Sequence, residues 1–167
     1  ATEINDFRGS LGLSPLILDP SLTLVAQNWT NMMAEAAIAS DLNTALEHNP
    51  TFFTEYPQDG LAAGSENILY NWGDDAETTV QQWIDSPGHY ANMTKEGDTH
   101  FGVGFIKFTS GDLAGYQMAT TNFGAYSAGS LISEGQIIPQ TPVDENESAV
   151  PPVDETDPVV PPVDETD

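Results

Sequence analysis

The residues best suited to chemistry in this chain are its three histidines, His48, His89 and His100. Because the chain has no cysteine, any transition-metal site must combine these imidazoles with carboxylates, a donor set that suits zinc or a similar divalent ion. The spacing of His48, Glu66 and His89 matches no local metal-binding motif. Each of these residues also has an interpretation without a metal: the histidines can be hydrogen-bonding residues, and Glu66 can be a solvated acid in a loop. Spacing alone therefore leaves both interpretations open.

His89 has the most favourable local context of the three. It follows Ser86-Pro87-Gly88, so it lies at an expected helix start beside a glycine, where a ligand can approach closely. His100 precedes an apolar run and is expected at the entry to a strand. The candidate serine nucleophiles lie in no Gly-x-Ser-x-Gly elbow, so nucleophilic catalysis has no motif here. These serines are Ser65, Ser86 and Ser110.

A mixed set of helices and strands must position these side chains. Asp19-Pro20-Ser21 supplies a capping residue and a proline at the start of a long helix that ends near Ser40. Its apolar residues recur at three- and four-residue steps and predict one buried face. That face comprises Leu22, Val25, Ala26, Trp29, Met32, Met33, Ala36 and Ala37.

Shorter elements complete the prediction. Helices are expected over 2–11, after Asp74 or Asp75, and from Pro87. Strands are expected over 101–108 and 116–123, joined by a turn at 109–112, with a further short strand at 67–70. Long helices early and paired strands late predict an α+β fold with helices packed on an antiparallel sheet.

Two glycines, Gly102 and Gly104, lie inside one of the predicted strands. They lack the third glycine and the following helix that a phosphate-binding loop requires. Their position inside a strand instead predicts that another element packs closely against the backbone there.

The charge balance excludes several classes of partner. The chain of 167 residues carries 26 acidic and three basic side chains, for a formal net charge of −23. With Arg8, Lys95 and Lys107 as its only Lys and Arg residues, it lacks the basic cluster that binds nucleic acid, and an anionic membrane surface is disfavoured for the same reason. No segment approaches the length of about 20 apolar residues that a membrane span needs.

The composition changes near the C-terminal end. Residues 140–167 hold nine acidic residues, no basic residue and six prolines, and Pro-Val-Asp-Glu recurs at 142–145, 152–155 and 162–165. Such a segment has too few apolar residues to form a core, so we expect a folded domain over 1–130 and a disordered, acidic, proline-rich linker over 131–167. Calcium binding by its Asp-Glu pairs is the weaker alternative, because no glycine turn would shape a loop for the ion.

Several fragments, in order between Ile4 and Gly124, resemble the CAP superfamily, which includes cysteine-rich secretory proteins, antigen 5 and pathogenesis-related proteins. The resemblance is to the cysteine-free bacterial branch. The fragments are Ile4-Asn5-Asp6-Phe7-Arg8, Leu13-Ser14-Pro15-Leu16, Asp19-Pro20-Ser21-Leu22, Ala26-Gln27-Asn28-Trp29, Glu47-His48-Asn49, Gly64-Ser65-Glu66-Asn67-Ile68, Trp83-Ile84-Asp85-Ser86-Pro87-Gly88-His89-Tyr90-Ala91-Asn92-Met93, His100-Phe101-Gly102-Val103-Gly104-Phe105 and Asn122-Phe123-Gly124.

This resemblance implies a three-layer α-β-α sandwich with a central antiparallel sheet and an open cleft. It implies that His48, His89 and Glu66 line the cleft and hold a divalent metal, with zinc favoured. Family members with a second acid place it three residues after the tryptophan, where this chain has Ser86. Asp85 is adjacent but points roughly 100° away on a helix. Nearby acids are expected to raise the pKa of both imidazoles.

The resemblance also implies a secreted, monomeric binding module whose cleft takes a small apolar or peptide ligand. The alternative is a peptidase-like hydrolase, with Glu66 or a metal-activated water as base and His89 assisting. A third interpretation makes the cleft structural and the acidic tail the active element, a spacer in a surface protein. The sterol-binding loop of eukaryotic members depends on disulfides that this chain lacks.

Overall fold

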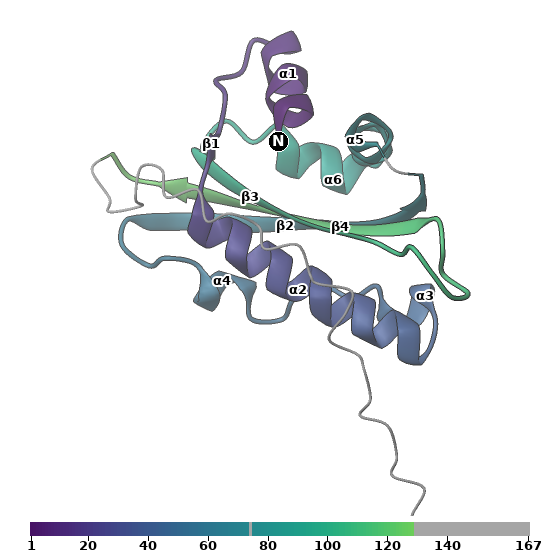
Figure 1. The fold of residues 1–167 in the computed structure, drawn as a ribbon. Coiled ribbons are helices and arrows are strands. Elements are labelled where there is room, and N and C mark those ends of the chain that lie inside the picture. Colours follow the sequence, from purple (N-terminus) through teal and green to yellow (C-terminus); the bar gives the residue numbers. More distant parts are fainter. Residues whose placement is uncertain (74, 129–167) are drawn as a thin grey trace, which may run out of the picture. The chain divides into compact units, whose positions relative to one another are not determined.

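The computed structural model describes residues 1–73 and 75–128, and the predicted linker at 131–167 lies outside these residues. A four-stranded sheet lies between two layers of helices (Figure 1). One layer contains α1 (Thr2–Ser10), α5 (Ala76–Ile84) and α6 (Pro87–Met93); the other contains α2 (Pro20–Ala39), α3 (Leu42–Ala45) and α4 (Phe52–Glu55). The predicted three-layer α-β-α sandwich is therefore confirmed.

The strands follow the order β1 (Ile17–Leu18), β3 (His100–Lys107), β4 (Tyr116–Tyr126) and β2 (Leu61–Trp72) across the sheet. The pairs β3–β4 and β4–β2 are antiparallel, and the short β1 pairs in parallel with β3. The strand β2 is far longer than the segment 67–70 predicted from the sequence. It lies at one edge of the sheet, so residues from both helical layers can approach it around that edge.

The helix α2 begins as predicted. The carboxylate of Asp19 accepts hydrogen bonds from the backbone nitrogens of Ser21 and Leu22, which satisfies two orphan donors of the first turn. The predicted buried face was partly wrong, because Met32 is 58% exposed while Thr30 is fully buried. The hydroxyl of Thr30 donates to the backbone oxygen of Ala26 within its own helix and lies 2.8 Å from the hydroxyl of Thr120 on β4, so the polar residue is satisfied against the sheet.

The glycines of β3 allow α2 to lie directly on the sheet. A β-carbon at Gly102 would overlap the backbone of Leu22 and Thr23, and one at Gly104 would overlap the backbone of Ala26. The close packing predicted for these two glycines is thus confirmed, and α2 is the element that packs there.

The guanidinium of Arg8 connects α1 to the end of α6. The residue is 1% exposed, and it donates to the backbone oxygens of Ser14 (2.9 Å), Met93 (2.7 Å) and Lys95 (3.3 Å). The carboxylate of Asp98 is fully buried nearby, 3.7 Å from the ammonium of Lys95. Burial raises the pKa of Asp98, and the positive charges of Lys95 and Arg8 oppose this rise. Arg8 and Lys95, two of the three Lys and Arg residues of the chain, thus lie near one internal acid.

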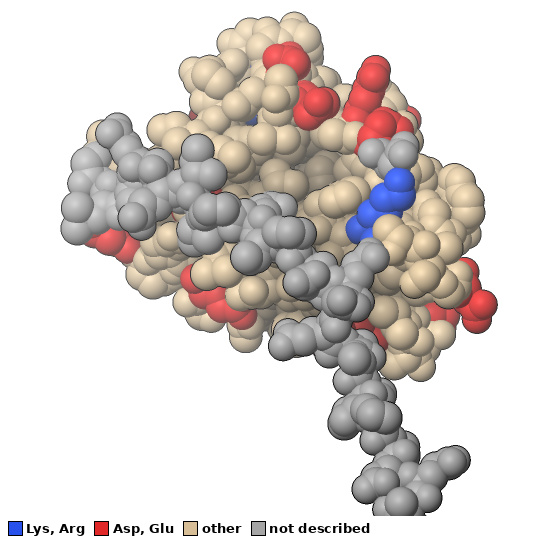
Figure 2. Space-filling view, in the orientation of Figure 1, with Lys and Arg blue, Asp and Glu red and all other residues tan. Residues whose placement is uncertain are grey.

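The exterior is correspondingly acidic. On the face drawn in Figure 2, acidic side chains occur in several separate places and basic side chains cover only a small area. Within residues 1–73 and 75–128, no helix has both the length and the apolar character needed to cross a membrane.

The candidate metal site at the edge of strand β2

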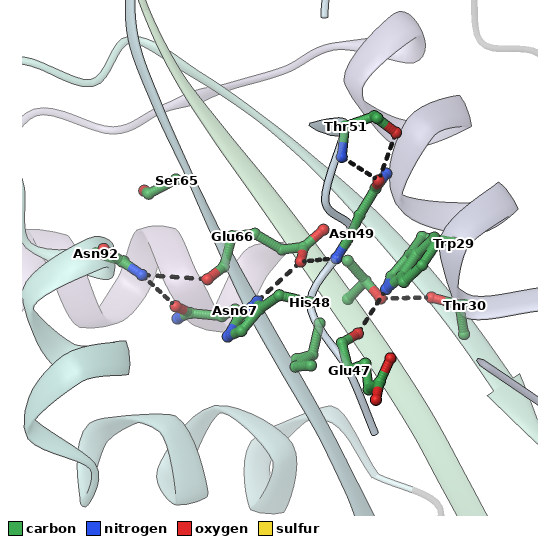
Figure 3. Close-up of polar contacts among 12 residues, drawn as sticks. Trp29, Thr30, Glu47, His48, Asn49, Thr51, Ser65, Glu66, Asn67 and Asn92 are labelled. Atoms are coloured by element: carbon green, nitrogen blue, oxygen red, sulfur yellow. Dashed lines mark hydrogen bonds and ion pairs between the residues drawn. The ribbon is translucent and has the colours of Figure 1, made fainter. Parts of the chain in front are cut away.

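The centre of the candidate site is a buried carboxylate on β2. The side chain of Glu66 is 1% exposed, and its Oε1 lies 2.9 Å from Nδ1 of His48 and 2.9 Å from the backbone nitrogen of Asn49 (Figure 3). When Glu66 is ionised its carboxylate can only accept, so Nδ1 of His48 then carries the proton and donates. In neutral His48 this leaves Nε2 as the nitrogen with a free lone pair.

The second oxygen of Glu66 is also occupied. Glu66 pairs with Asn122 of β4 in the sheet register, and the amide of Asn122 satisfies its neighbours when its nitrogen donates to Oε2 of Glu66 at 3.1 Å. Burial raises the pKa of Glu66, while the hydrogen bonds from His48 and Asn49 lower it. The carboxylate is thus a buried acceptor with three donors around it.

The loop that carries His48 is held at several points. The indole nitrogen of Trp29 on α2 donates to the backbone oxygen of Glu47 at 2.8 Å. Asn49 is 2% exposed, and its side-chain oxygen accepts from the backbone nitrogen of Thr51 at 2.9 Å (Figure 3). These contacts place His48, whose side chain is 59% exposed, at the surface directly beside Glu66.

The second predicted histidine reaches the same part of β2 from the opposite layer. The amide nitrogen of Asn67 donates to the backbone oxygen of His89 on α6 at 3.0 Å. Because Glu66 and Asn67 are consecutive in a strand, their side chains point to opposite faces of the sheet. The backbone of His89 thus lies beside the same short segment of β2 as the pair of His48 and Glu66, but on the other face of the sheet.

The electrostatic prediction for His89 was wrong in sign. The pKa of His89 is lowered, first by burial and second by the positive charge of nearby His48. The expected rise assumed carboxylates around both rings, whereas Glu66 faces His48 in the other layer. His89 consequently remains neutral to a lower pH than a free imidazole, which favours metal binding because the ligand must be deprotonated.

The set of His48, His89 and Glu66 stays a prediction as a three-ligand metal site. In residues 1–73 and 75–128, no group of three or more His, Cys, Asp or Glu side chains is arranged to hold a metal ion. Two surface cavities, of about 400 and about 270 Å³, are lined by other residues, so the shared cleft also stays a prediction.

A second acid, Glu55, lies near Glu66, whereas Asp85 is engaged elsewhere. Asp85 accepts from the side chain of Gln81 at 2.9 Å, so it is engaged on its own helix α5. Glu55 of α4 instead lies near Glu66, and its negative charge contributes to the raised pKa of that residue. Asn49 connects the two, because its backbone nitrogen donates to Glu66 and its side-chain nitrogen donates to Glu55 at 3.2 Å. In the sequence, the only indication of Glu55 is that it follows Thr51 by four residues, the spacing of one helical turn.

His100 lies apart from this site. It belongs to β3, which β4 separates from β2, and its ring packs edge-on against Tyr126 at a centroid distance of 5.4 Å. Its Nδ1 lies 2.8 Å from the hydroxyl of Thr99. Burial lowers the pKa of His100, and the negative charge of Asp19 opposes this shift.

We expect His100 to make the fold acid-sensitive. With its pKa below the ordinary value of 6.5, the folded state binds fewer protons than the unfolded state, so the free energy of unfolding decreases as the pH falls below 6.5. Replacing His100→Gln should therefore reduce the drop in melting temperature between about pH 7.5 and about pH 5.5, measured by circular dichroism. An equally steep drop in the variant would contradict this prediction.

Comparisons with known proteins agree with the fold. A family model described as the CAP, or cysteine-rich secretory protein, family matches residues 1–123. An outer surface protein from Borrelia burgdorferi is 19% identical with a TM-score of 0.56, and the match covers 75% of this chain and 89% of that one. An extracellular protein containing an SCP domain from Bacillus anthracis is 23% identical with a TM-score of 0.51, over 72% of this chain and 37% of that one.

No curated protein matches the chain significantly. The structural neighbours, at these identities, support the fold alone, whereas the family model covers most of the sequence. The layered sheet and the match over residues 1–123 together show that the chain belongs to the CAP, or cysteine-rich secretory protein, family.

Proposed function

We propose that this domain is an extracellular binding module that holds a divalent cation, with zinc favoured, between the imidazoles of His48 and His89. The observation that carries the proposal is the 2.9 Å contact between Glu66 and Nδ1 of His48. Histidines that bind metals commonly donate their other ring N–H to a carboxylate, which fixes the tautomer and the orientation of the ring. Glu66 holds His48 in this arrangement, with Nε2 available to the ion.

The donor set fits a cation of this kind. Imidazole nitrogens suit zinc, and the lowered pKa of His89 keeps its ring neutral at the pH where zinc would bind. A bound ion would have coordination positions that the protein does not fill, and a donor atom of a ligand could take one of them. Because both oxygens of Glu66 already accept hydrogen bonds, the proposal makes Glu66 the partner of His48 rather than a third ligand. In this proposal Glu66 therefore has no role as a hydrolytic base.

An extracellular location is part of the proposal. It is supported by the described neighbours, one an outer surface protein and the other an extracellular protein. In this proposal, the ligand of the domain is a small apolar molecule or a peptide with a donor atom that coordinates the ion. The strongly acidic composition is compatible with attraction of cations and unfavourable for anionic ligands.

The test is zinc titration by calorimetry. We expect one zinc per chain in the wild type, and loss of stoichiometric uptake in His48→Ala and in His89→Ala with normal melting. Glu66→Gln, which keeps a similar shape but loses the charge, should weaken zinc binding by about 10- to 100-fold. His100→Ala is the matched control and should bind zinc like the wild type. Equal zinc uptake by the His48→Ala/His89→Ala double variant would overturn the proposal.

A further inference from the structure

We propose that Asn67 and Asn92 are positioning residues that fix α6 on the edge of β2 and thereby set His89 in place relative to His48. This inference rests on the proposed function of the two histidines. The amide nitrogen of Asn92 donates to the side-chain oxygen of Asn67 at 2.8 Å and to the backbone oxygen of Glu66 at 3.2 Å (Figure 3). Asn67 in turn donates to the backbone oxygen of His89 at 3.0 Å.

We call Asn67 and Asn92, with these three hydrogen bonds, the latch. The latch attaches the helix of His89 to β2 directly next to Glu66, the residue that holds His48. Glu66 orients His48 on one face of β2, and Asn67, the next residue, holds the backbone of His89 on the other face. Only one peptide unit separates the two attachments. A displacement of α6 along the strand would therefore break the bond to His89 while leaving the pair of His48 and Glu66 intact.

The part of α6 that contains His89 has few other attachments. The helix is seven residues long, and in the described structure its N-cap, Ser86, makes no side-chain capping bond. Its far end is fixed more strongly, because Met93 is fully buried and its backbone oxygen accepts from Arg8. Near His89, the ring of Tyr90 contacts Phe7 edge-on at 5.7 Å. Such a short helix is marginal alone, so the bond from Asn67 is the main polar constraint on this turn.

The burial of Asn67 supports a specific role. Asn67 is fully buried, yet its amide nitrogen and its amide oxygen each have a hydrogen-bond partner. Asn71 lies four residues further along the same strand and on the same face, but its side-chain atoms are buried without a hydrogen-bond partner in the described structure. Asn71 therefore provides a matched control, an asparagine that shares the strand and the face but not the latch.

The first experiment needs no metal. Because the chain has no cysteine, Glu47→Cys and Ala91→Cys at two exposed positions accept spin labels specifically. Pulsed electron resonance then measures the distance distribution between the loop of His48 and α6. We expect a narrow distribution in this labelled background, a broad or shifted one after Asn92→Ala or Asn67→Ala, and an unchanged one after Asn71→Ala. Unchanged distributions in both latch variants would overturn the inference.

The second experiment separates positioning from general stability by a double-mutant cycle on zinc affinity. Asn92→Ala, at a half-buried position, should weaken zinc binding by about tenfold while Asn71→Ala does not. In the Asn92→Ala background, His89→Ala should cost about tenfold less zinc affinity than it costs in the wild type, whereas His48→Ala should cost as much as it does in the wild type. If His89→Ala costs as much with Asn92 absent as with it present, the latch does not position His89.

The two experiments distinguish the inference from the function on which it rests. If the wild type takes up no zinc, the proposed function fails, and the spin-label distances alone decide whether the latch holds α6. If Asn67→Ala does not fold, Asn92→Ala decides both experiments, because that side chain is only partly buried.

Discussion

Replacing Gly102→Ala is expected to destabilise the domain by about 3 kcal/mol or more, the upper range for overpacking a core. The added methyl group would overlap the backbone of Leu22 and Thr23, which cannot rotate away as a side chain can. The helix α2 would have to lift from β3, and the apolar contacts between them would loosen. Urea unfolding monitored by circular dichroism measures the change.

The controls for this prediction come from other glycines. Gly9→Ala on α1 meets no described atom within 4 Å and should be neutral or slightly stabilising, since alanine favours a helix over glycine. Gly104→Ala should destabilise like Gly102→Ala, because its methyl group would overlap the backbone of Ala26. The Gly102→Ala/Gly104→Ala double variant should lose less stability than the two single variants together, because one displacement of α2 relieves both overlaps. A stable Gly102→Ala protein would show that α2 can separate from β3 at little cost.

Replacing Arg8→Met is expected to cost about 3 kcal/mol or more, because leaving even one buried acceptor without its donor costs about 1–3 kcal/mol. Three backbone oxygens lose their donor, and the buried carboxylate of Asp98 retains only Lys95 as a neighbouring positive charge. The methionine preserves most of the volume of the side chain, so the loss reflects charge and hydrogen bonding. The free energy of unfolding in urea checks the prediction.

Lys95→Met provides the comparison for Arg8→Met. It removes a positive charge near the same carboxylate, but its side chain is 41% exposed, so its loss should cost at most about 1 kcal/mol. Adding Asp98→Asn to Arg8→Met should recover part of the stability, because it removes the uncompensated charge. A cost below about 1 kcal/mol for Arg8→Met would mean that the guanidinium and its carbonyl partners are exchanged for water without loss.

Most of the helices could be predicted because their signals are local. Asp19 and Pro20 predict the start of α2. Asp75 precedes α5 and caps it by accepting from the backbone nitrogen of Thr78. The extent of β2 could not be predicted in the same way. Glu66 has the ordinary interpretation of a solvated loop acid, and its burial depends on partners such as Asn122 that are distant in sequence.

The residues of the candidate metal site were selected from the sequence, and their binding of a metal stays a prediction. The resemblance to the family selected His48, Glu66 and His89; the structure pairs the side chains of His48 and Glu66 and places the backbone of His89 beside Asn67, the next residue of β2. The resemblance could not indicate that hydrogen-bond donors surround the carboxylate of Glu66, or that Glu55 lies near it. Nor could it give the lowered pKa of His89, because burial and the charge of His48 are properties of the folded chain.

The attachment of α5 and α6 to β2 has a consequence for self-association. The indole of Trp83 makes a long hydrogen bond of 3.5 Å to the backbone oxygen of Ile68, and Asn92 donates to that of Glu66 at 3.2 Å. These two carbonyl groups belong to an outermost strand of the sheet, where a foreign strand would otherwise add to the ladder. The side chains that hold the helices thus also occupy two carbonyl groups with which the edge strand of a second molecule would have to pair.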